Sequence, residues 1–403
     1  MNVLVIGGGI GGLCTALGLA RRGYRVRVFD QSDPAEHAGS GLVLSPNGIR
    51  ALDRLSPEAG QKVRAEAVPG PHRFNYVSHT GKVKVRIEPT DLVAKWKAPL
   101  VAMRRRLLHR ILLDCLPPGA LTLGSRFVQA KETGDEVTAR FADGSTARGD
   151  LLVGADGVWS MARHHLGTKR TPRYLGISSV RGITPAPEHT YPGGFFSQGP
   201  GLQIFANPLR NGDLYWAATL NAAEHEWPQL HPEYARERLS RMVKDWHAPI
   251  PDLVAETPTG QLVVTDIHDM NTLPTWTTPR MALLGDAAHP MAPFLGQGAN
   301  AAIEDAAVFC TLLPDLAPTP AVTAHSLPAP TTQMAVATAP DALRAYETAR
   351  VPRTTRLSKM SRRIGMAGQW ENPTAIAIRD TMMKLAFKYG GEGPDTWLYG
   401  YET

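Results

Sequence analysis

Three aspartates stand where short apolar runs end, and glycines lie beside two of them. They are Asp30, Asp156 and Asp286, in a chain of 403 residues. An ionised carboxylate accepts hydrogen bonds and donates none, so Asp30 and Asp286 suit the hydroxyl groups of a ribose or a ribityl-type chain. Glycine-containing turns that lead into a helix place unpaired backbone amides where an anion can bind. The pattern therefore predicts a ligand that carries both sugar-type hydroxyls and anionic groups.

The first aspartate follows a strand, a turn and a helix at the N-terminus. Residues 3–6 predict a buried strand, Gly7, Gly9 and Gly12 follow, and apolar residues then recur at helical spacing. This is the dinucleotide fingerprint, whose glycines allow a tight turn, approach of the backbone to pyrophosphate and close helix–strand packing. Asp30 comes 18 residues after Gly12. An acid there favours an unphosphorylated ribose, hence FAD or NAD and not NADP at this site.

The stretch Met281–Leu313 has the same order of features. Residues 281–284 predict a buried strand, Asp286 follows it, and the loop Gly296–Asn300 leads into apolar residues at helical spacing. The N-terminus of that helix would favour an anion or an electron-rich carbonyl. Taken alone, the stretch is also compatible with a plain strand-to-helix connection.

The run GDAAHPMAPFLGQGAN, followed by residues 303–306, resembles the second flavin-binding motif of the single-component FAD-dependent aromatic hydroxylases. The resemblance implies that Asp286 contacts the ribityl chain, that Pro293 lies beside the reactive flavin carbon, and that the loop amides cover the pyrimidine end of the isoalloxazine. His289 lies inside this motif and is expected to be structural.

Asp156-Gly157 ends an apolar strand and resembles that family's strand-to-helix motif, which serves the FAD pyrophosphate and the nicotinamide nucleotide. Ser160 is expected to cap or support the next helix, and Arg163 to face the anionic phosphates.

The resemblance also implies FAD contacts outside these motifs. Arg104 is the expected contact on the phosphate side, although the family usually has His where this chain has Met103, and Arg105 and Arg106 are expected on the solvated surface. The expected contact of the adenine is the backbone near Phe127. The complete predicted set for non-covalent FAD is Gly7, Gly9, Ile10, Gly11, Gly12, Asp30, Gln31, Gly41, Leu42, Arg104, Phe127, Asp156, Asp286, Pro293, Gly296, Gln297, Gly298, Ala299 and Asn300.

The predicted fold class is α/β: a Rossmann-like FAD-binding domain of the glutathione-reductase type, an inserted antiparallel β-sheet substrate domain and a C-terminal helical segment. A kink or restart is expected at Pro352. The tail Asp395–Tyr401 resembles the terminus of the salicylate, 3-hydroxybenzoate and urate hydroxylase branch. The expected divisions are residues 1–70, 101–172 and 276–313 for the FAD-binding domain, 71–100 for a hairpin of the substrate domain, 173–275 for its β-rich part, 314–340 for a Pro/Ala/Thr-rich loop and 341–403 for the C-terminal helices.

Residues of the β-rich part are expected to line a substrate pocket over the flavin. Gln203 and Phe205 share a face if the strand period is two. The other expected substrate contacts are Arg181, Tyr215 and Trp216, although aromatic residues on a half-buried sheet are more often core. Tyr215 and Pro293 are the expected catalytic residues.

The composition is ordinary for a soluble globular protein. Lysine and arginine number 43 against 37 acids, for a net charge of +6, which assists capture of anionic ligands. The densest basic stretch, Arg350–Arg363, is expected to be a solvated helix face without nucleic-acid contacts. Cys14, Cys115 and Cys310 have no metal-ligand or redox spacing and are expected to be reduced thiols. No apolar run is long enough to span a membrane and the N-terminus lacks a basic leader, so a cytoplasmic monomer or homodimer is expected.

The resemblance implies a monooxygenase reaction. NADH or NADPH would pass hydride to FAD, O2 would add to the flavin as a C4a-hydroperoxide, and the distal oxygen would be transferred to a small phenolic or heteroaromatic substrate. The urate-handling branch usually has Arg at the position of Gln203 in this chain, which favours a phenolic ring. Two alternatives stay open: tailoring of a larger polycyclic compound by the same chemistry, and a flavin-dependent reductase or dehydrogenase that does not oxygenate.

Overall fold

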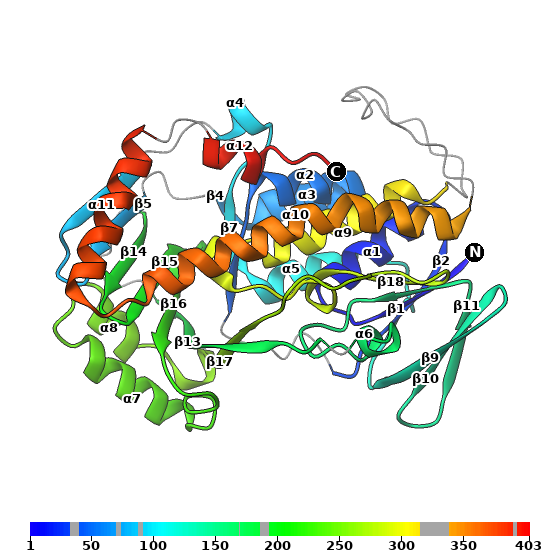
Figure 1. The fold of residues 1–403 in the computed structure, drawn as a ribbon, viewed down its shortest axis with the longest axis horizontal. Coiled ribbons are helices and arrows are strands. Elements are labelled where there is room, and N and C mark those ends of the chain that lie inside the picture. The colour runs from blue at the N-terminus through cyan, green and yellow to red at the C-terminus, as the bar shows by residue number, and fades with distance from the viewer. Residues whose placement is uncertain are drawn as a thin grey trace.

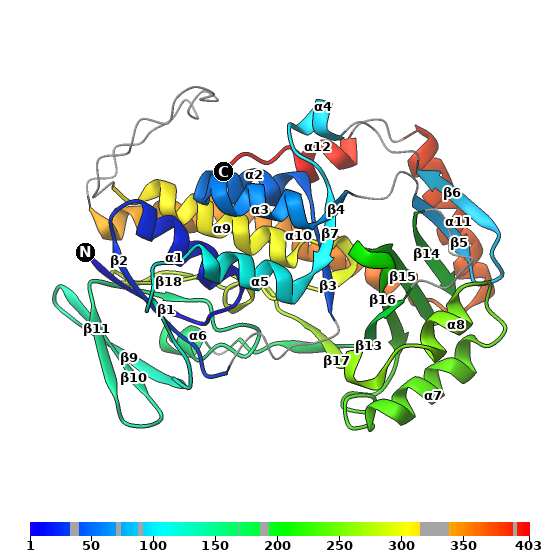
Figure 2. The same ribbon diagram turned by 180° about the vertical axis from the view of Figure 1, so that it is seen from behind.

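The computed structural model describes residues 1–32, 40–69, 74–87, 92–168, 170–185, 193–314, 338–389 and 393–403. Two large sheets stand apart and a long helix, α10 (Ala339–Gly368), runs from one to the other (Figures 1 and 2). Most of the loop expected at 314–340 lies outside the described residues. Among the residues that are described, no helix is both long and apolar enough to cross a bilayer.

The first sheet is parallel and contains the N-terminal strand. Its order is β18-β12-β1-β2-β8, and each neighbouring pair is parallel. Strands as short and apolar as these are expected where a sheet is covered on both faces. They are β1 (Asn2–Ile6), β2 (Arg25–Phe29), β8 (Leu121–Thr122), β12 (Leu151–Gly154) and β18 (Met281–Leu283).

Helices cover one face of this sheet, and a small antiparallel sheet accompanies it on the other side (Figure 1). The helices are α1 (Ile10–Arg21), α9 (Gly298–Leu312) and α5 (Arg105–Asp114). The strands of the small sheet are β9 (Phe127–Thr133), β10 (Glu136–Phe141) and β11 (Thr146–Gly149). The strands and helices predicted at both flavin motifs are confirmed.

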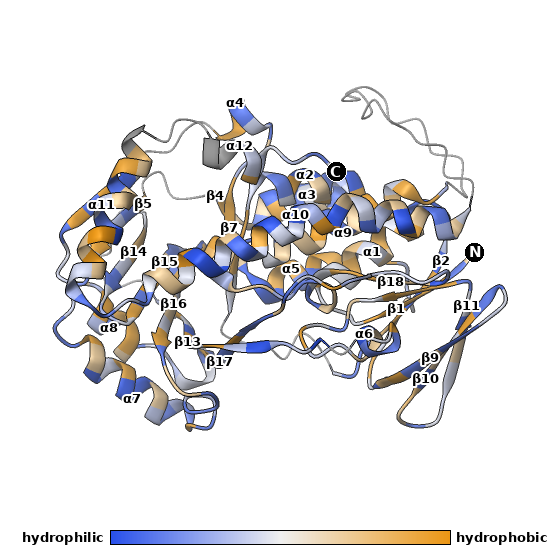
Figure 3. Cartoon of the chain, in the orientation of Figure 1, coloured by the Kyte–Doolittle hydropathy of each residue, from blue (hydrophilic) through white to orange (hydrophobic). Residues whose placement is uncertain are grey.

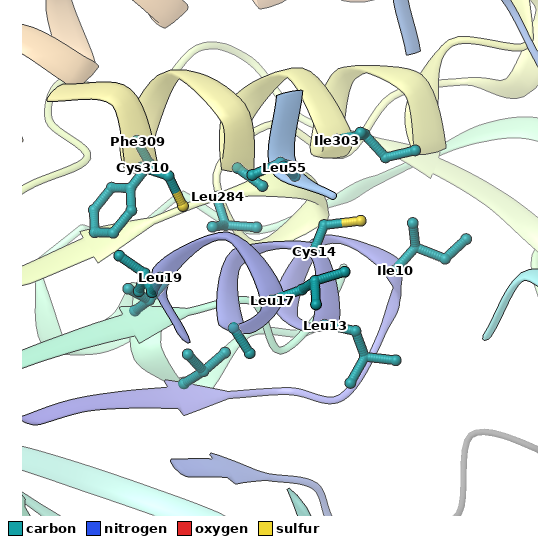
Figure 4. Close-up of a cluster of buried hydrophobic side chains, with 14 of the residues drawn as sticks. Ile10, Leu13, Cys14, Leu17, Leu19, Leu55, Leu284, Ile303, Phe309 and Cys310 are labelled. Atoms are coloured by element: carbon teal, nitrogen blue, oxygen red, sulfur yellow. The ribbon is translucent and has the colours of Figure 1, made fainter. Parts of the chain in front are cut away.

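Helices α1 and α9 pack closely against each other (Figure 4). Cys14 and Cys310 are both fully buried at this contact. A Cβ at Gly18 would stand 2.7 Å from the sulfur of Cys310, so the glycine permits the close approach. Burial raises the pKa of the Cys310 thiol to about 12, and both thiols therefore behave as small apolar groups.

The second sheet has seven strands in the order β17-β13-β16-β15-β14-β5-β6. All neighbours are antiparallel except β14 and β5, which pair in parallel. The hairpin predicted between residues 71 and 100 is confirmed and forms one edge. The strands are β5 (Phe74–Ser78), β6 (Val83–Ile87), β13 (Arg173–Pro185), β14 (Gly194–Gly199), β15 (Leu202–Pro208), β16 (Asp213–Asn221) and β17 (Leu262–Asp269).

One face of this sheet, here called the back face, is covered by α7 (Pro232–Val243) and α8 (Ile250–Ala255). These two helices were not predicted within the β-rich part, residues 173–275. Hydrophilic and hydrophobic residues alternate along α7 and α10 (Figure 3), as they do in helices that have one side on a core.

Smaller elements connect the two sheets and complete the C-terminus. Helix α10 continues through Pro352 without a break, so the predicted restart is wrong. The remaining elements are β3 (Gly41–Leu44), β4 (Val68–Pro69), β7 (Val101–Arg104), α2 (Pro46–Leu55), α3 (Pro57–Glu66), α4 (Leu92–Trp96), α6 (Met161–His165), α11 (Pro373–Tyr389) and α12 (Gly393–Tyr399).

Candidate functional site

The three sequence motifs meet at the carboxyl edge of the parallel sheet. The amide of Gly7 donates to the carbonyl of Phe29 (2.8 Å), and that of Ala155 donates to the carbonyl of Ile6 (2.7 Å). Leu284 continues the ladder by donating to Gly154 (3.0 Å). The turns that follow β1, β2, β12 and β18 therefore lie side by side, where open α/β sheets bind nucleotides.

The glycines of these turns fit a bound dinucleotide. Gly7 has a φ of +106°, and a Cβ there would stand 2.3 Å from the carbonyl oxygen of Ala155. A Cβ on Gly9, Gly296 or Gly298 would meet no atom within 4 Å, so their backbones face open space. Ile10, Gly11 and Gly12 form the buried first turn of α1. The residues present thus suit pyrophosphate at the N-terminus of α1.

Asp30 is held at the end of β2 by two backbone amides. Its carboxylate accepts from Gly8 (2.6 Å) and Ser32 (3.0 Å), while Gln31 is exposed. The amide of Ser125 donates to the carbonyl of Asp30 (2.8 Å), which brings the segment before Phe127 to this end of the site. The Phe127 ring is buried against that of Phe141, so the predicted adenine contact would be made by the backbone, and it stays a prediction.

Asp156 caps α6. Its carboxylate accepts from the amides of Met161 (2.8 Å) and Ala162 (3.0 Å) and from the Ser160 hydroxyl. Ser160 in turn accepts from the amide of Arg163 (2.9 Å), which confirms the predicted cap. Burial raises the pKa of Asp156, and these hydrogen bonds oppose that shift.

The prediction that Arg163 faces the phosphates is wrong. Its guanidinium is 1% exposed and donates to the carbonyls of Val158 (2.6 Å) and Ala287 (3.1 Å). Because a buried guanidinium needs acceptors on several sides, the two carbonyls fix its orientation. Arg163 therefore ties the Asp156 turn to the Asp286 turn.

Asp286 lies in a single turn of 3₁₀ helix, Gly285–Ala287. Its side chain is accessible to solvent but crowded by protein atoms; this desolvation raises its pKa, against the charges of His289 and Arg105. Asp305 anchors the turn by accepting from the Gly285 amide (2.8 Å) and from His289. Burial works against ionisation of Asp305, yet the His289 and Arg350 charges lower its pKa to about 2. The structural role predicted for His289 is confirmed.

The loop Gly296–Asn300 is fastened to the segment that follows β3. Asn300 donates to the carbonyls of Val43 (3.2 Å) and Gly296 (2.9 Å) and accepts from the amide of Ser45 (2.9 Å). Gln297 donates to the Ser45 hydroxyl (3.1 Å). Both side chains are buried, whereas Pro293 and Gly296 are exposed and Gly298 and Ala299 are half-buried. The backbone of the loop is thus the part available to a ligand.

Arg104 is the last residue of β7, and Arg105 is the first residue of α5. Arg104 forms an ion pair with Asp213 (2.6 Å) at the start of β16 and does not point to the phosphate side. Arg105 is exposed to solvent, as predicted, although neighbouring protein atoms crowd it. This desolvation lowers its pKa, and the charge of Asp286 opposes that shift. Arg105 thus lies where the charge of Asp286 acts on it, whereas Arg104 is paired with Asp213.

The face of the second sheet opposite α7 and α8, here called the front face, carries most of the predicted substrate contacts. Phe205 and Tyr215 meet there with ring centroids 6.1 Å apart. Arg181 donates to Thr265 (2.7 Å), and Gln203 is buried beside Gln198 (3.3 Å) and Gly368. Gln203 and Phe205 share this face, as the period of two predicts.

Trp216 is the exception, and its prediction as a substrate contact is wrong. Successive residues of a strand point to opposite faces, so Tyr215 and Trp216 cannot both face one pocket. Trp216 is fully buried in the core under α7 and α8, and its indole N–H donates to Thr257 (2.9 Å).

Four buried charged residues near the loop Gly296–Asn300 were not predicted from the sequence. Arg350 and Arg353, expected on a solvated face, are 0% and 8% exposed and pair with Glu304 and Asp305. Two adjacent acids in an otherwise apolar helix could have indicated these pairs, because buried carboxylates require cationic partners.

Comparisons with known proteins agree with this geometry. The model of the FAD binding domain family matches residues 1–317. The aurachin C monooxygenase/isomerase of Stigmatella aurantiaca is 34% identical over 393 residues, covering 96% of this chain and 94% of that protein. The 3-amino-4-hydroxybenzoate 2-monooxygenase PtmB3 of Streptomyces platensis is 32% identical, covering 100% and 96%.

Among solved structures, Klebsiella pneumoniae HpxO complexed with FAD and uric acid superposes with a TM-score of 0.84. It is 26% identical, and the match covers 99% of this chain and 97% of HpxO. A salicylate hydroxylase substrate complex shares the fold at a TM-score of 0.73 and 22% identity, covering 100% and 96%. The chain belongs to the FAD binding domain family and is an FAD-dependent monooxygenase of the single-component aromatic hydroxylase type.

Proposed function

We propose that this monooxygenase uses NAD(P)H and O2 to hydroxylate a small phenolic or heteroaromatic ring held against the front face of the second sheet. The observation that carries the proposal is the position of β3 between the two halves of the site. Its Gly41 meets the ring of Tyr215, and the carbonyl of its Val43 accepts from Asn300 of the flavin loop. The front face and the FAD-binding loop are thereby brought together.

FAD, when bound, supplies the redox chemistry, and the protein supplies position and charge. Asp286 would accept from the ribityl hydroxyls. The free amides at the N-terminus of α9 would stabilise negative charge on the reduced ring, by about 1 to 2 kcal/mol in a partly buried setting. Pro293 is exposed on this loop and would lie beside the reacting carbon.

Tyr215 is the residue we propose to handle the substrate proton. Burial raises the pKa of its hydroxyl, and the charges of Arg181 and Arg105 oppose that rise. A protonated hydroxyl can take the proton of a phenolic substrate while passing its own proton on to water, and can then donate a hydrogen bond to the phenolate oxygen; loss of the substrate proton makes the ring a better nucleophile. Arg181 and Arg105 would stabilise the same anion.

The substrate we propose carries hydrogen-bonding substituents on an aromatic ring. Gln203 offers a neutral amide, and its Nε2 atom has no hydrogen-bond partner within the described residues. The names of the relatives include acids such as 3-amino-4-hydroxybenzoate and a larger compound, aurachin C. Tailoring of a larger natural product by the same chemistry is therefore the second proposal.

One experiment tests both proposals. The purified protein should be yellow, and small aromatics should be screened for stimulated NADH or NADPH oxidation under ¹⁸O2. We expect a product whose mass increases by one labelled oxygen atom. Stimulated oxidation without incorporation for every compound, large or small, would favour a reductase instead.

A further inference from the structure

The C-terminal run Trp397–Tyr401 is tied to two helices behind the flavin loop. The segment returns over α2 beside α10 (Figures 1 and 2). Arg353 donates to the carbonyls of Trp397 and Leu398 (2.7 Å), and Arg50 donates to that of Tyr401 (2.9 Å). Backbone carbonyls of the tail therefore satisfy guanidinium groups of α10 and α2.

Aromatic rings of the tail cover the arginines of α10. The Tyr401 ring centroid lies 4.9 Å from the Arg350 guanidinium and 4.8 Å from that of Arg353. The Trp397 ring lies 4.3 Å from Arg356, which is exposed. The face of an aromatic ring attracts a cation, most strongly where water is excluded. The ring of Tyr401 thus packs against the guanidinium groups of two buried arginines.

These arginines neutralise the acidic pair of α9. Arg350 reaches Glu304 (2.8 Å) and Asp305 (2.6 Å), and Arg353 reaches Glu304 (3.0 Å). Both acids are 0% exposed. Buried ion pairs hold their geometry only when every charge keeps its partners, so displacement of either arginine would release the acids.

The acids hold the two loops that contact FAD. Glu304 accepts from Asn47 (2.6 Å), whose amide also donates to Gln297 (3.0 Å) directly before Gly298. Asp305 accepts from the amide of Gly285, directly before Asp286. An unbroken series of contacts therefore leads from Tyr401 to both ends of the flavin-binding backbone.

We propose that Tyr401, Arg350 and Arg353 are positioning residues, and that the tail Trp397–Tyr401 sets the flavin-binding geometry of the Asp286 and Gly298 backbone through Glu304 and Asp305. This rests on FAD binding at those two loops. It assigns a role to the tail motif that is separate from substrate contact.

The first test compares Tyr401→Leu with Tyr401→Phe at a temperature where circular dichroism shows both to be folded. The leucine variant removes the ring, and we expect its dissociation constant for FAD to rise about five- to ten-fold, the scale of a partly desolvated cation–π contact. The visible circular dichroism of the bound flavin should change as well. The phenylalanine variant keeps the ring and should match the wild type in both measurements.

Two arginine variants of α10 distinguish a positioning role from a general loosening of the tail. Arg353→Met should weaken FAD binding and alter the flavin spectrum, whereas Arg356→Met removes a contact with Trp397 only and should leave both unchanged. If Tyr401→Leu does not fold, Glu304→Gln, which keeps the side-chain shape, carries the same expectation.

Folded Tyr401→Leu or Glu304→Gln protein with wild-type affinity and spectrum overturns the proposal, as does an equal effect of Arg356→Met and Arg353→Met. A wild-type protein that binds no FAD would instead overturn the assignment of the site.

Discussion

The ring of Tyr215 lies against the backbone of Gly41, so closely that a Cβ at residue 41 would stand 2.4 Å from the ring atom Cγ. Gly41 begins β3 and Tyr215 belongs to β16. The contact joins the second sheet to the strand that also fastens the loop Gly296–Asn300 through Val43 and Asn300. A change on either side of it is transmitted to the other.

Gly41→Ala should therefore disturb both halves of the site. The added methyl must displace β3 or the tyrosine ring, and we expect a loss of roughly 1 to 3 kcal/mol in unfolding free energy together with a lower kcat. Urea unfolding and steady-state kinetics measure the two effects. Because the clash is with the ring, the losses of Gly41→Ala and Tyr215→Ala should be less than additive; full additivity would argue against the contact.

Tyr215→Phe tests the proton-handling role. We expect kcat to fall by about 100-fold, at the low end of general acid–base contributions, with unchanged FAD affinity. Burial raises the pKa of this hydroxyl above its ordinary value of 10.0, so the proton is present at neutral pH and is lost only as pH rises through that higher value. A pH profile of kcat should show no Tyr215-dependent limb near neutrality, and a variant with wild-type kcat would exclude the role.

Asp286→Ala should weaken FAD binding about 10- to 100-fold, since hydrogen bonds to a charged group are lost. The pKa of Asp286 is raised by burial, so its charge costs stability in the folded protein above that pKa. Removal of the charge should consequently raise the Tm of the apoprotein at pH 7. In the wild type, FAD affinity should fall as acid protonates this carboxyl, at a higher pH than for an ordinary aspartate. Fluorescence titration measures the affinity, and unchanged occupancy would contradict the ribityl contact.

Arg105→Met should lower FAD or substrate affinity, because its charge lies near Asp286, Arg181 and Tyr215. Arg106 is exposed, as Arg105 is, so Arg106→Met is the matched control and should behave as the wild type. Arg104→Met should chiefly loosen the pairing with Asp213 and reduce stability by at most about 1 kcal/mol, since the pair is partly exposed. If Arg104→Met reduced FAD affinity more than Arg105→Met, the sequence-based assignment would be restored.

Asp305 should make the fold sensitive to acid. His289 and Arg350 lower its pKa to about 2 against the opposing effect of burial, from an ordinary value of 3.8. Because the pKa of Asp305 is lower in the folded protein, its charge stabilises the fold above the pKa of the unfolded chain. This stability is lost as pH falls from about 4 towards 2. Arg350→Met should weaken this dependence without abolishing it, since His289 remains beside Asp305, and should cost about 3 to 5 kcal/mol because two buried acids lose a cationic partner. Urea unfolding between pH 2 and 7 measures both; an Arg350→Met curve parallel to the wild type would exclude the coupling.

The parallel sheet and its motifs were predictable because strand, turn and helix signals lie within a few residues of each other. Gly7, Asp30 and Asp286 each follow a strand, and the strand order then brings them together. The face of a side chain was also predictable where it depends on period alone, as for Gln203 and Phe205. The same rule excludes Trp216 once Tyr215 is assigned to the front face.

The long-range contacts were not predictable. The pairing of Arg104 depends on Asp213, more than 100 residues later in the sequence, and the burial of Arg350 depends on the acids of α9 and on the tail. A basic stretch with helical spacing looks solvated until its partners are known, since the cost of burying a charge depends on what surrounds it.

The parallel pairing of β5 with β14 determines how this protein can be divided. Strand β5 ends at Ser78 and β14 begins at Gly194, while β18, the edge of the nucleotide-binding sheet, begins only at Met281. Each sheet therefore stays incomplete until a much later part of the chain has been synthesised. We expect folding to be slow and to finish after translation. We also expect that neither half of the chain folds on its own.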